Sequence, residues 1–195
     1  LSVCDYNLEK ISTKKYKAGH NLLAEVCMAA NYEAQSLEKY RAQYEAKYHD
    51  FGSTICTVLA RSFADIGDIV RGKDLYLGNP QESAQREKLE NNLKTIFGKI
   101  HEGLSRTSGA QTYYNGDGPD YYQLREDWWY ANRHTVWKAI TCDAPRDAQY
   151  FRGTCGGDGK HSTLAKVKSL AKVKCRCDGA NIVPTYFDYV PQYLR

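Results

Sequence analysis

The sequence predicts an all-α fold, a disulfide-linked helical bundle with long loops. Three observations predict it: four stretches carry apolar residues at helical spacing, prolines number only five, and there are seven cysteines. Few prolines and many long side chains argue against a β-sandwich or barrel. A chain of 195 residues can bury one good core or two small ones, so we expect one domain or part of one.

The first two helices are expected on either side of residue 52. Residues 21 to about 48 are rich in Leu, Ala, Glu and Lys and contain no Pro or Gly, and this helix should end near Gly52. Its apolar stripe consists of Leu22, Leu23, Val26, Cys27 and Ala30. A second stripe, which stops at Gly72, consists of Ile55, Leu59, Phe63, Ile66 and Val70. We expect this second helix to pack against the first.

A third and a fourth helix are expected further along. Asn79 can cap a helix whose first turn contains Pro80 and Glu82. The stripe behind this start consists of Leu89, Leu93, Ile96, Phe97, Ile100 and Leu104, and Glu90 and Lys94 lie one turn apart on the outer face. The fourth helix is expected over residues 122–141, with core positions at Leu124, Trp128, Trp129, Ala131, Val136, Trp137 and Ile140.

The remaining stretches are expected to be loops or cut elements. Residues 105–121 and 153–179 are rich in residues that interrupt helices, so they read as loops. Residues 184–195 turn amphipathic again, which indicates the start of a helix. The chain starts at Leu1 and has neither a leader nor an apolar stretch long enough to span a bilayer. We therefore expect a fragment that does not insert into a membrane itself.

The cysteines indicate an oxidising, extracellular compartment. A bridge between Cys175 and Cys177 would be strained. If the first helix is continuous, Cys27 lies roughly 30 Å from its far end, whereas Cys56 opens the next helix near that end, so these two should not pair. The preferred scheme joins Cys155 with Cys177, and joins Cys27 and Cys56 with Cys142 and Cys175 in an order that stays open. Cys4 is then left over, with its partner in sequence upstream.

Metal and enzyme signatures are weak. Cys142, Cys155, Cys175 and Cys177 could ligate zinc, but the chain lacks the paired Cys-x-x-Cys knuckles of such sites, so we expect no metal and no cofactor. The segment GGDGKH at Gly156 resembles a phosphate loop, but Thr154 and His161 stand where a glycine and a hydroxyl belong. The five histidines are scattered, and we expect that the protein is not an enzyme. The net charge of +4 is mild and interspersed, which argues against nucleic acid as a partner.

Two loop features are candidate binding sites. A tandem LAKVK repeat at Leu164 creates a concentrated basic loop, whose cations are Lys160, Lys166, Lys168, Lys172, Lys174 and Arg176. Such a cluster could bind a sulfated or sialylated glycan, or it could be a solvated variable loop. The segment QTYYNGDGPDYY at Gln111 mixes tyrosines with Gly, Asn and Asp as antibody loops do. Its candidate contact residues are Tyr113, Tyr114 and Tyr121, unless the tyrosines fold back on their own helix.

Four blocks of sequence carry a resemblance to a known family. They are CDYNLEKI at Cys4, ARSFADIGDIVRGKDLYLGN at Ala60, LREDWWYANRHTVWKAITC at Leu124 and PTYFDYVPQYLR at Pro184. In this order they closely resemble the anchor blocks of alpha-class Duffy-binding-like domains, which sit at the head of the variant erythrocyte membrane proteins of Plasmodium falciparum. The resemblance implies helical subdomains stitched by disulfides, displayed on the extracellular face of the infected erythrocyte membrane as part of a larger anchored protein.

The resemblance also implies a division of the chain and a function. Residues 1–20 should end a first subdomain, 21–183 should form a helical second one, and 184–195 should begin a truncated helix. The implied function is adhesion to host cell-surface receptors. Because the basic loop is the one feature above background, the first choice of receptor is an anionic or blood-group-type carbohydrate, including heparan sulfate-like polymers. The alternative is a structural scaffold that orients adjacent domains of the same polypeptide and presents variable antigenic loops. An intracellular metal-binding bundle is a third, more distant hypothesis.

Overall fold

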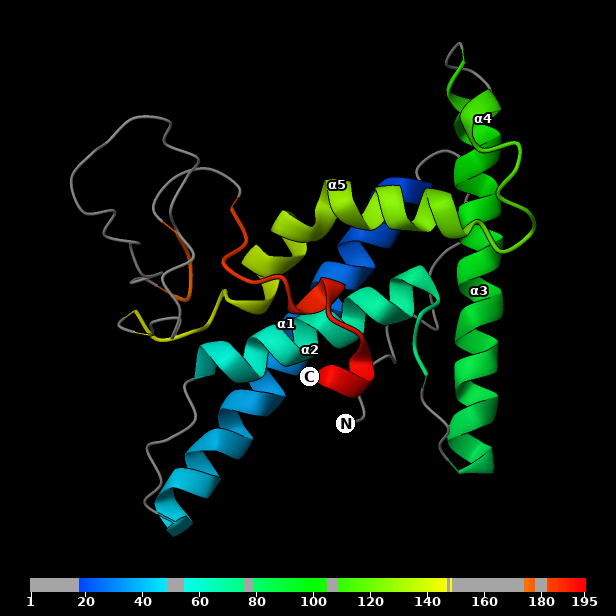
Figure 1. Ribbon diagram of the computed structural model, residues 1–195. Coiled ribbons are helices and arrows are strands. Elements are labelled where there is room, and N and C mark those ends of the chain that lie inside the picture. Colours follow the sequence, from blue (N-terminus) through cyan, green and yellow to red (C-terminus); the bar gives the residue numbers. More distant parts are fainter. Residues whose placement is uncertain are drawn as a thin grey trace, which may run out of the picture. The chain divides into compact units, whose positions relative to one another are not determined.

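The computed structural model describes residues 18–48, 55–75, 79–104, 109–146, 148, 174–177 and 182–195 (Figure 1). Its helices are α1 (Ala18–Tyr48), α2 (Ile55–Arg71), α3 (Pro80–Leu104), α4 (Ala110–Tyr113) and α5 (Tyr122–Ile140), followed by the 3₁₀-helices η2 (Phe187–Tyr189) and η3 (Gln192–Leu194). Within these ranges no residue lies in an extended strand. The predicted all-α class is confirmed, and the four long helices lie within a few residues of their predicted bounds.

Two local signals set the boundary between α2 and α3. Gly72 adopts a left-handed backbone with φ of 70°, its N–H donates to Ile69 O at 3.1 Å, and Lys73 N–H donates to Asp68 O at 2.8 Å. This pair of bonds is the Schellman motif, which satisfies carbonyls at the end of a helix. At the start of α3, Asn79 Oδ1 accepts the N–H of Glu82 at 2.9 Å, as the capping pattern predicts.

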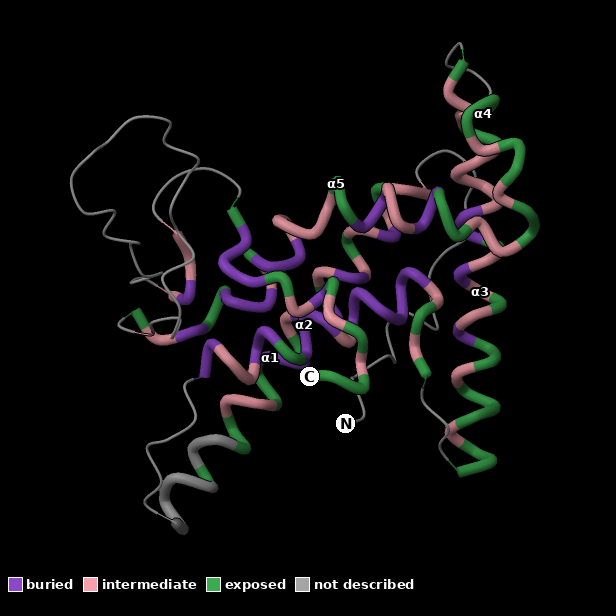
Figure 2. The backbone as a smooth tube through the Cα atoms, in the orientation of Figure 1, coloured by how far each residue is buried: buried purple, intermediate pink, exposed green. Residues whose placement is uncertain are grey.

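The chain divides into two compact units, each built from two separate segments: residues 1–29 with 65–133, and residues 30–64 with 134–195. Helices α1, α2 and α5 therefore contribute residues to both units. Figure 2 shows buried positions along most of α2 and on one side of α3. Each unit has its own buried apolar residues.

The core of the first unit packs the second half of α2 against α3 and α5. Its largest buried side chains are Phe97, Trp128 and Trp129, and the rings of Phe97 and Trp128 meet edge to face at 6.1 Å. Gly67 makes room for Trp129, because a Cβ atom at Gly67 would lie 2.8 Å from Cζ2 of the indole. The tryptophans are core residues, as their spacing predicts. Ala131, by contrast, is exposed, so its predicted core position was wrong.

The second unit is organised around Trp137. Its indole is 1% exposed and meets the ring of Phe63 edge to face at 5.2 Å. The first half of α2 supplies further buried apolar residues, which are Ile55, Cys56, Leu59, Ala60 and Ala64. One buried polar pair accompanies them: Ser62 Oγ donates to Glu33 Oε1 at 3.1 Å.

The C-terminal residues form two separate 3₁₀-turns, η2 and η3, and not the start of the α-helix that the sequence predicts. Proline explains the break, since Pro191 lies between the turns with φ of −52° and ψ of 141° and has no N–H to continue a helix. The predicted divisions after residues 20 and 183 stay predictions. In the part of the chain described, every helix is too short or too polar to span a bilayer.

Candidate receptor-binding surfaces

The loop before α5 is held in place by three anchors. Asp117 Oδ1 and Oδ2 accept the backbone N–H groups of Gln123 and Leu124 at 2.6 and 2.8 Å, which caps the start of α5. Lys94 Nζ of α3 pairs with Asp120 at 2.7 Å, which raises the pKa of Lys94. Short helix α4 begins after Gly109, whose φ is 87°, and it contacts α3. The described part of this loop is therefore held in a defined conformation against α3 and α5.

The three candidate tyrosines of this loop divide between the two predicted roles. Tyr113 is 69% exposed and lies edge to face on Tyr114 at 4.9 Å. Tyr114 folds back, because its hydroxyl donates to Asp127 Oδ2 of α5 at 3.0 Å. Tyr121 also folds back: its ring lies 5.6 Å from that of His101, and its hydroxyl lies near Gly98. Only Tyr113 of the three presents its ring broadly to solvent.

The anchoring of Tyr114 changes the pKa of its phenol. Burial, and then the hydrogen bond to the charged Asp127, raise the pKa of Tyr114 from 10.0 to about 12. A phenol whose folded pKa is raised stabilises the fold fully below the unfolded value, and that contribution is lost as the pH rises from about 10 to about 12.

We expect the Tyr114 phenol to titrate separately from an unperturbed tyrosine. The difference in tyrosinate absorbance between the native chain and Tyr114→Phe should have its midpoint near pH 12. In an Asp127→Asn background the midpoint should fall, since the opposing negative charge is gone, but it should stay above that of an unperturbed tyrosine, because burial, the larger cause, remains. A midpoint near 10 in the unmodified background would contradict the buried hydrogen bond.

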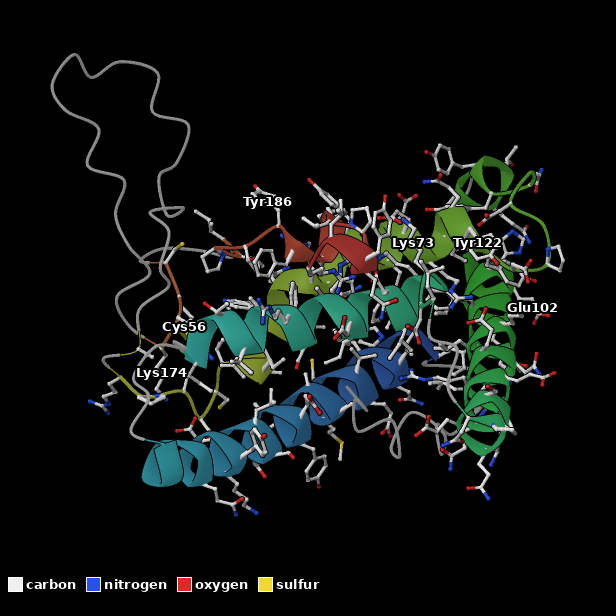
Figure 3. The ribbon with its side chains drawn as sticks, turned by 60° about the horizontal axis from the view of Figure 1, so that its bottom comes forward. Cys56, Lys73, Glu102, Tyr122, Lys174 and Tyr186 are labelled. Atoms are coloured by element: carbon white, nitrogen blue, oxygen red, sulfur yellow. A yellow bond between two sulfur atoms is a disulfide. The ribbon has the colours of Figure 1, made fainter. Side chains whose placement is uncertain are left out.

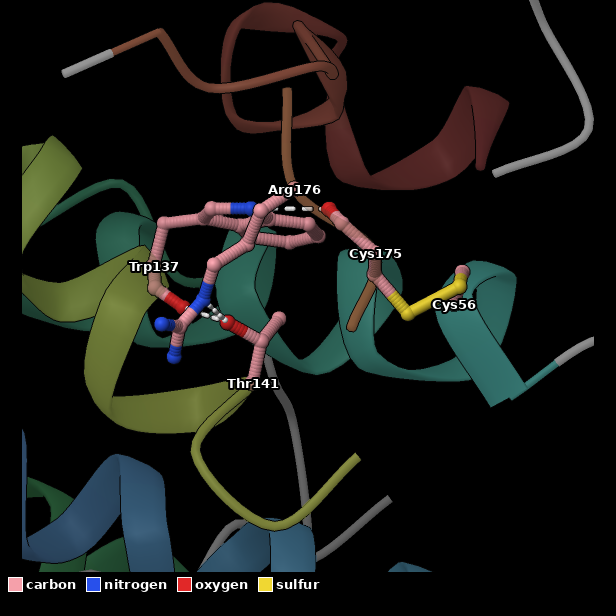
Figure 4. Close-up of a disulfide and its surroundings, with 5 residues drawn as sticks. All are labelled: Cys56, Trp137, Thr141, Cys175 and Arg176. Atoms are coloured by element: carbon pink, nitrogen blue, oxygen red, sulfur yellow. Dashed lines mark hydrogen bonds between the residues drawn. A yellow bond between two sulfur atoms is a disulfide. The ribbon is translucent and has the colours of Figure 1, made fainter. Parts of the chain in front are cut away.

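The basic loop is only partly described. Lys160, Lys166, Lys168 and Lys172 lie outside the described residues, whereas Lys174 and Arg176 are described. Lys174 Nζ donates to Cys142 O at 2.7 Å. The guanidinium of Arg176 donates to Thr141 Oγ1 at 2.7 Å and to Lys138 O (Figure 4). Both cations therefore bind oxygens at the C-terminal end of α5, where the helix dipole favours positive charge.

A disulfide positions these two cations. Cys175 lies between Lys174 and Arg176 in sequence and is joined to Cys56 at the start of α2. Its backbone is held on both sides, because its N–H donates to Ala148 O at 3.1 Å and its carbonyl accepts the indole N–H of Trp137 at 3.3 Å (Figure 4). Lys174 and Cys175 both have left-handed backbones, with φ of 50° and 56°. The chain thus turns sharply against α5 at this point.

The other cysteines agree only in part with the predicted scheme. Cys56 and Cys175 are one of the pairs that the scheme left open, and Cys177 is also disulfide-bonded. Its predicted partner Cys155, like Cys4, lies outside the described residues. Cys27 and Cys142 carry free thiols, so the disulfides predicted for these two are absent from the structure. Burial raises the pKa of the Cys27 thiol, which disfavours the thiolate that disulfide formation requires.

Two buried arginines of the first unit were not anticipated. Arg125 is 0% exposed: its Nε donates to Val70 O at 2.7 Å, and its guanidinium binds both oxygens of Glu90 at 2.6 and 2.9 Å. Arg71 is 2% exposed and donates to Asp68 at 3.0 Å and Glu126 at 3.2 Å. A signal was present, since both arginines lie inside or at the end of an apolar stripe, where a charge requires a partner.

Charged side chains of α3 and α5 bind partners from other parts of the chain. Glu90 and Lys94 lie one turn apart on α3, but Glu90 binds Arg125 and Lys94 binds Asp120. Glu126 accepts hydrogen bonds from both Lys73 and Arg71. Burial alone would raise the pKa of Glu126, but these two cations outweigh it and hold the pKa below its usual range. Tertiary partners thus take precedence over neighbours one turn away.

The helical, disulfide-linked architecture agrees with the similarity of the chain to known proteins. A family model described as the Duffy binding domain matches residues 1–195. The chain belongs to the Duffy-binding-like family. No match was found among curated proteins. In the part of this Duffy-binding-like chain that the structure describes, no group of three or more His, Cys, Asp or Glu side chains could hold a metal ion.

Several solved structures that the chain resembles are domains of PfEMP1. It is 40% identical to the NTS-DBL1α1 domain of Plasmodium falciparum PfEMP1 from the varO strain, with a TM-score of 0.73. It is 41% identical to the NTS-DBL1α and CIDRγ double domain of the same strain, with a TM-score of 0.69. It is 32% identical to the ICAM-1-binding IT4var13 DBLβ domain of PfEMP1, with a TM-score of 0.64.

The chain is thus more similar in sequence to the two DBL1α structures than to the DBLβ domain, and the matches also show how much of a domain is present. Each match covers 98% of this chain, but only 39%, 25% and 39% of the three solved chains in the order given. The Duffy-binding-like chain thus spans about two fifths, or less, of the structures that it matches.

Proposed function

We propose that this chain is part of an adhesion module that binds host cell-surface receptors on the extracellular face of the infected erythrocyte membrane. It does so within a larger anchored polypeptide and without catalysis. Support comes from the family and from the similarity to a DBLβ domain described as ICAM-1-binding. The chain also resembles a double domain in which a DBL1α domain is joined to a CIDRγ domain, which supports adjacent domains as partners.

We further propose that the receptor contact includes an anionic glycan, a sulfated polymer such as heparan sulfate or a blood-group-type carbohydrate on red cells. The observation that carries this proposal is the concentration of lysines in the basic loop, at Lys160, Lys166, Lys168 and Lys172. Ammonium groups within a Debye length, about 8 Å at physiological salt, reinforce one another against a polyanion. Lys174 and Arg176 belong to the same loop, but their contacts with α5 give them a positioning role as well.

The test removes the loop's charge without disturbing the end of α5. Replacing Lys160, Lys166, Lys168 and Lys172 with serine should weaken binding to heparin and to red cells and flatten its salt dependence, since fewer counterions are displaced. The matched control replaces four lysines elsewhere, Lys39, Lys88, Lys99 and Lys138, which removes the same charge. Equal losses in both variants, or unchanged binding in the loop variant, would rule the glycan contact out.

The scaffold alternative has its own support. Two of the predicted glycan ligands cap α5, and two of the three candidate tyrosines are directed back onto helices. A scaffold would hold neighbouring domains in place and present the variable loops as antigenic decoration. A folded chain that binds neither glycans nor cells, while the complete head region binds both, would favour the scaffold over the adhesion module.

A further inference from the structure

A small cavity in the first unit lies where the end of α2, the middle of α3 and the start of α5 meet. Its volume is about 290 Å³. The floor is apolar and consists of three buried aliphatic residues, Ile69, Leu89 and Leu93. This volume lies near the lower end of the range of ligand pockets, which begins at roughly 300 Å³, and it is large enough for one long side chain.

Charged residues form the rim, and most of them are already neutralised. Arg86 pairs with Asp74 at 3.4 Å. Lys94 pairs with Asp120 at 2.7 Å. Arg125, which does not itself line the cavity, binds Glu90. Glu87 is exposed at the rim and, among the described residues, makes no ion pair or hydrogen bond. The rim therefore carries one carboxylate in excess.

An aromatic ring borders the same cavity. Tyr122 is 50% exposed and lines the pocket together with α3 (Figure 3). Its ring already receives one guanidinium, since Cζ of Arg125 lies 5.9 Å from its centroid. Gly72 lies beside the ring, since a Cβ atom there would lie 3.0 Å from both Tyr122 Cε1 and Arg125 Cζ. Because half of the Tyr122 surface remains exposed, a second planar group can reach the residue.

We propose that this cavity receives the side chain of an arginine from a protein partner. An arginine stem is apolar enough for the aliphatic floor, and its planar guanidinium can stack on Tyr122 while it binds the Glu87 carboxylate in a two-point contact. An acidic ligand would meet the excess negative charge. A neutral sugar would leave that charge without a counterion. This contact goes beyond the proposed glycan binding and uses none of the basic loop.

The test uses the full chain and a minimal probe, N-acetyl-arginine amide, with binding followed by shifts of the backbone amides in ¹H–¹⁵N spectra. The shifts should cluster at the residues that line the cavity and saturate in the millimolar range. Glu87→Gln should weaken binding on the order of five-fold, and Glu87→Arg should abolish it. The control is Glu102→Gln, an exposed carboxylate further along the same helix (Figure 3), which should leave the affinity unchanged.

A second probe separates charge from shape. N-acetyl-citrulline amide has nearly the same size and no charge, and it should bind at least about five-fold more weakly. Equal binding of the two probes, shifts outside the cavity, or equal losses in the Glu87 and Glu102 variants would each overturn the proposal. Heparin binding by the same Glu87 variants should be unchanged. Failure of the glycan contact would therefore leave this result intact, and the reverse also holds.

Discussion

Replacing both Cys56 and Cys175 with serine is expected to lower the free energy of unfolding by about 4 to 5 kcal/mol. The disulfide joins residues 119 positions apart. In the chain-entropy treatment, a loop of this length removes about 5 kcal/mol of conformational freedom from the unfolded state. Urea unfolding under non-reducing conditions, followed by circular dichroism, measures the loss.

The control for this variant is Cys142→Ser. Cys142 is an exposed free thiol, so its replacement should change the free energy of unfolding by no more than about 0.5 kcal/mol. A loss below about 1 kcal/mol in the double variant would mean that the unfolded chain is already constrained in another way. The native contacts of Lys174 and Arg176 with the end of α5 should weaken together with the disulfide, because Cys175 holds their backbone in place.

The second large effect is expected for Arg125→Ala, with a loss of about 3 to 5 kcal/mol. The side chain is fully buried and binds the Glu90 carboxylate together with the carbonyls of Ile69 and Val70 at the end of α2. Its removal leaves the carbonyls of Ile69 and Val70 without their donor, which costs more than the lost contacts alone. Thermal and urea unfolding of the variant would measure the change.

A pair of further variants separates the ion pair from the packing. Arg125→Met keeps much of the volume, and combining it with Glu90→Leu removes the stranded carboxylate as well. The double variant should be less destabilised than the sum of the two single ones, because each single variant leaves one charge of the pair without its partner. Arg61→Met, at an exposed position of α2, should change stability by no more than about 0.5 kcal/mol. A loss of less than about 1 kcal/mol for Arg125→Ala would refute the structural role.

The helices were predictable because local signals set their ends. Gly72 supplies the left-handed residue at the end of α2, and Asn79 supplies the cap of α3. Both effects act within one or two turns, so the sequence alone contains them. Helix α4 was missed because it is only four residues long and lies in a stretch rich in Gly, Asn and Asp. A helix of one turn has no apolar period to detect.

The partners of charged residues could not be predicted in the same way. Spacing along α3 places Lys94 next to Glu90, but Asp120 and Arg125 come from distant sequence and bind these side chains in the folded chain. The positions of Lys174 and Arg176 in a basic loop likewise indicated a ligand, whereas the fold directs both toward α5. A cluster of charged residues in the sequence indicates that those side chains require partners of opposite charge or polar acceptors. Only the tertiary structure shows which groups those partners are.

Cysteine pairing was less predictable than the helix ends and more predictable than the partners of charged residues. Helix length was enough to exclude a bridge between Cys27 and Cys56. It did not choose among the remaining partners, because seven cysteines permit many connectivities and spacing alone does not rank them. The bond between Cys56 and Cys175 depends on how α2 approaches a segment more than a hundred residues later.

The hydrogen bond from Cys175 N–H to Ala148 O has a consequence for how such a sequence can evolve. It fixes the two ends of the stretch between residues 148 and 174 side by side, and the disulfide, Trp137 and the end of α5 hold one of those ends. When the ends of a segment are fixed, doubling its length costs only about 0.6 kcal/mol in closure entropy. Insertions and replacements in this stretch, repeats such as LAKVK among them, are therefore expected to cost the folded chain little stability.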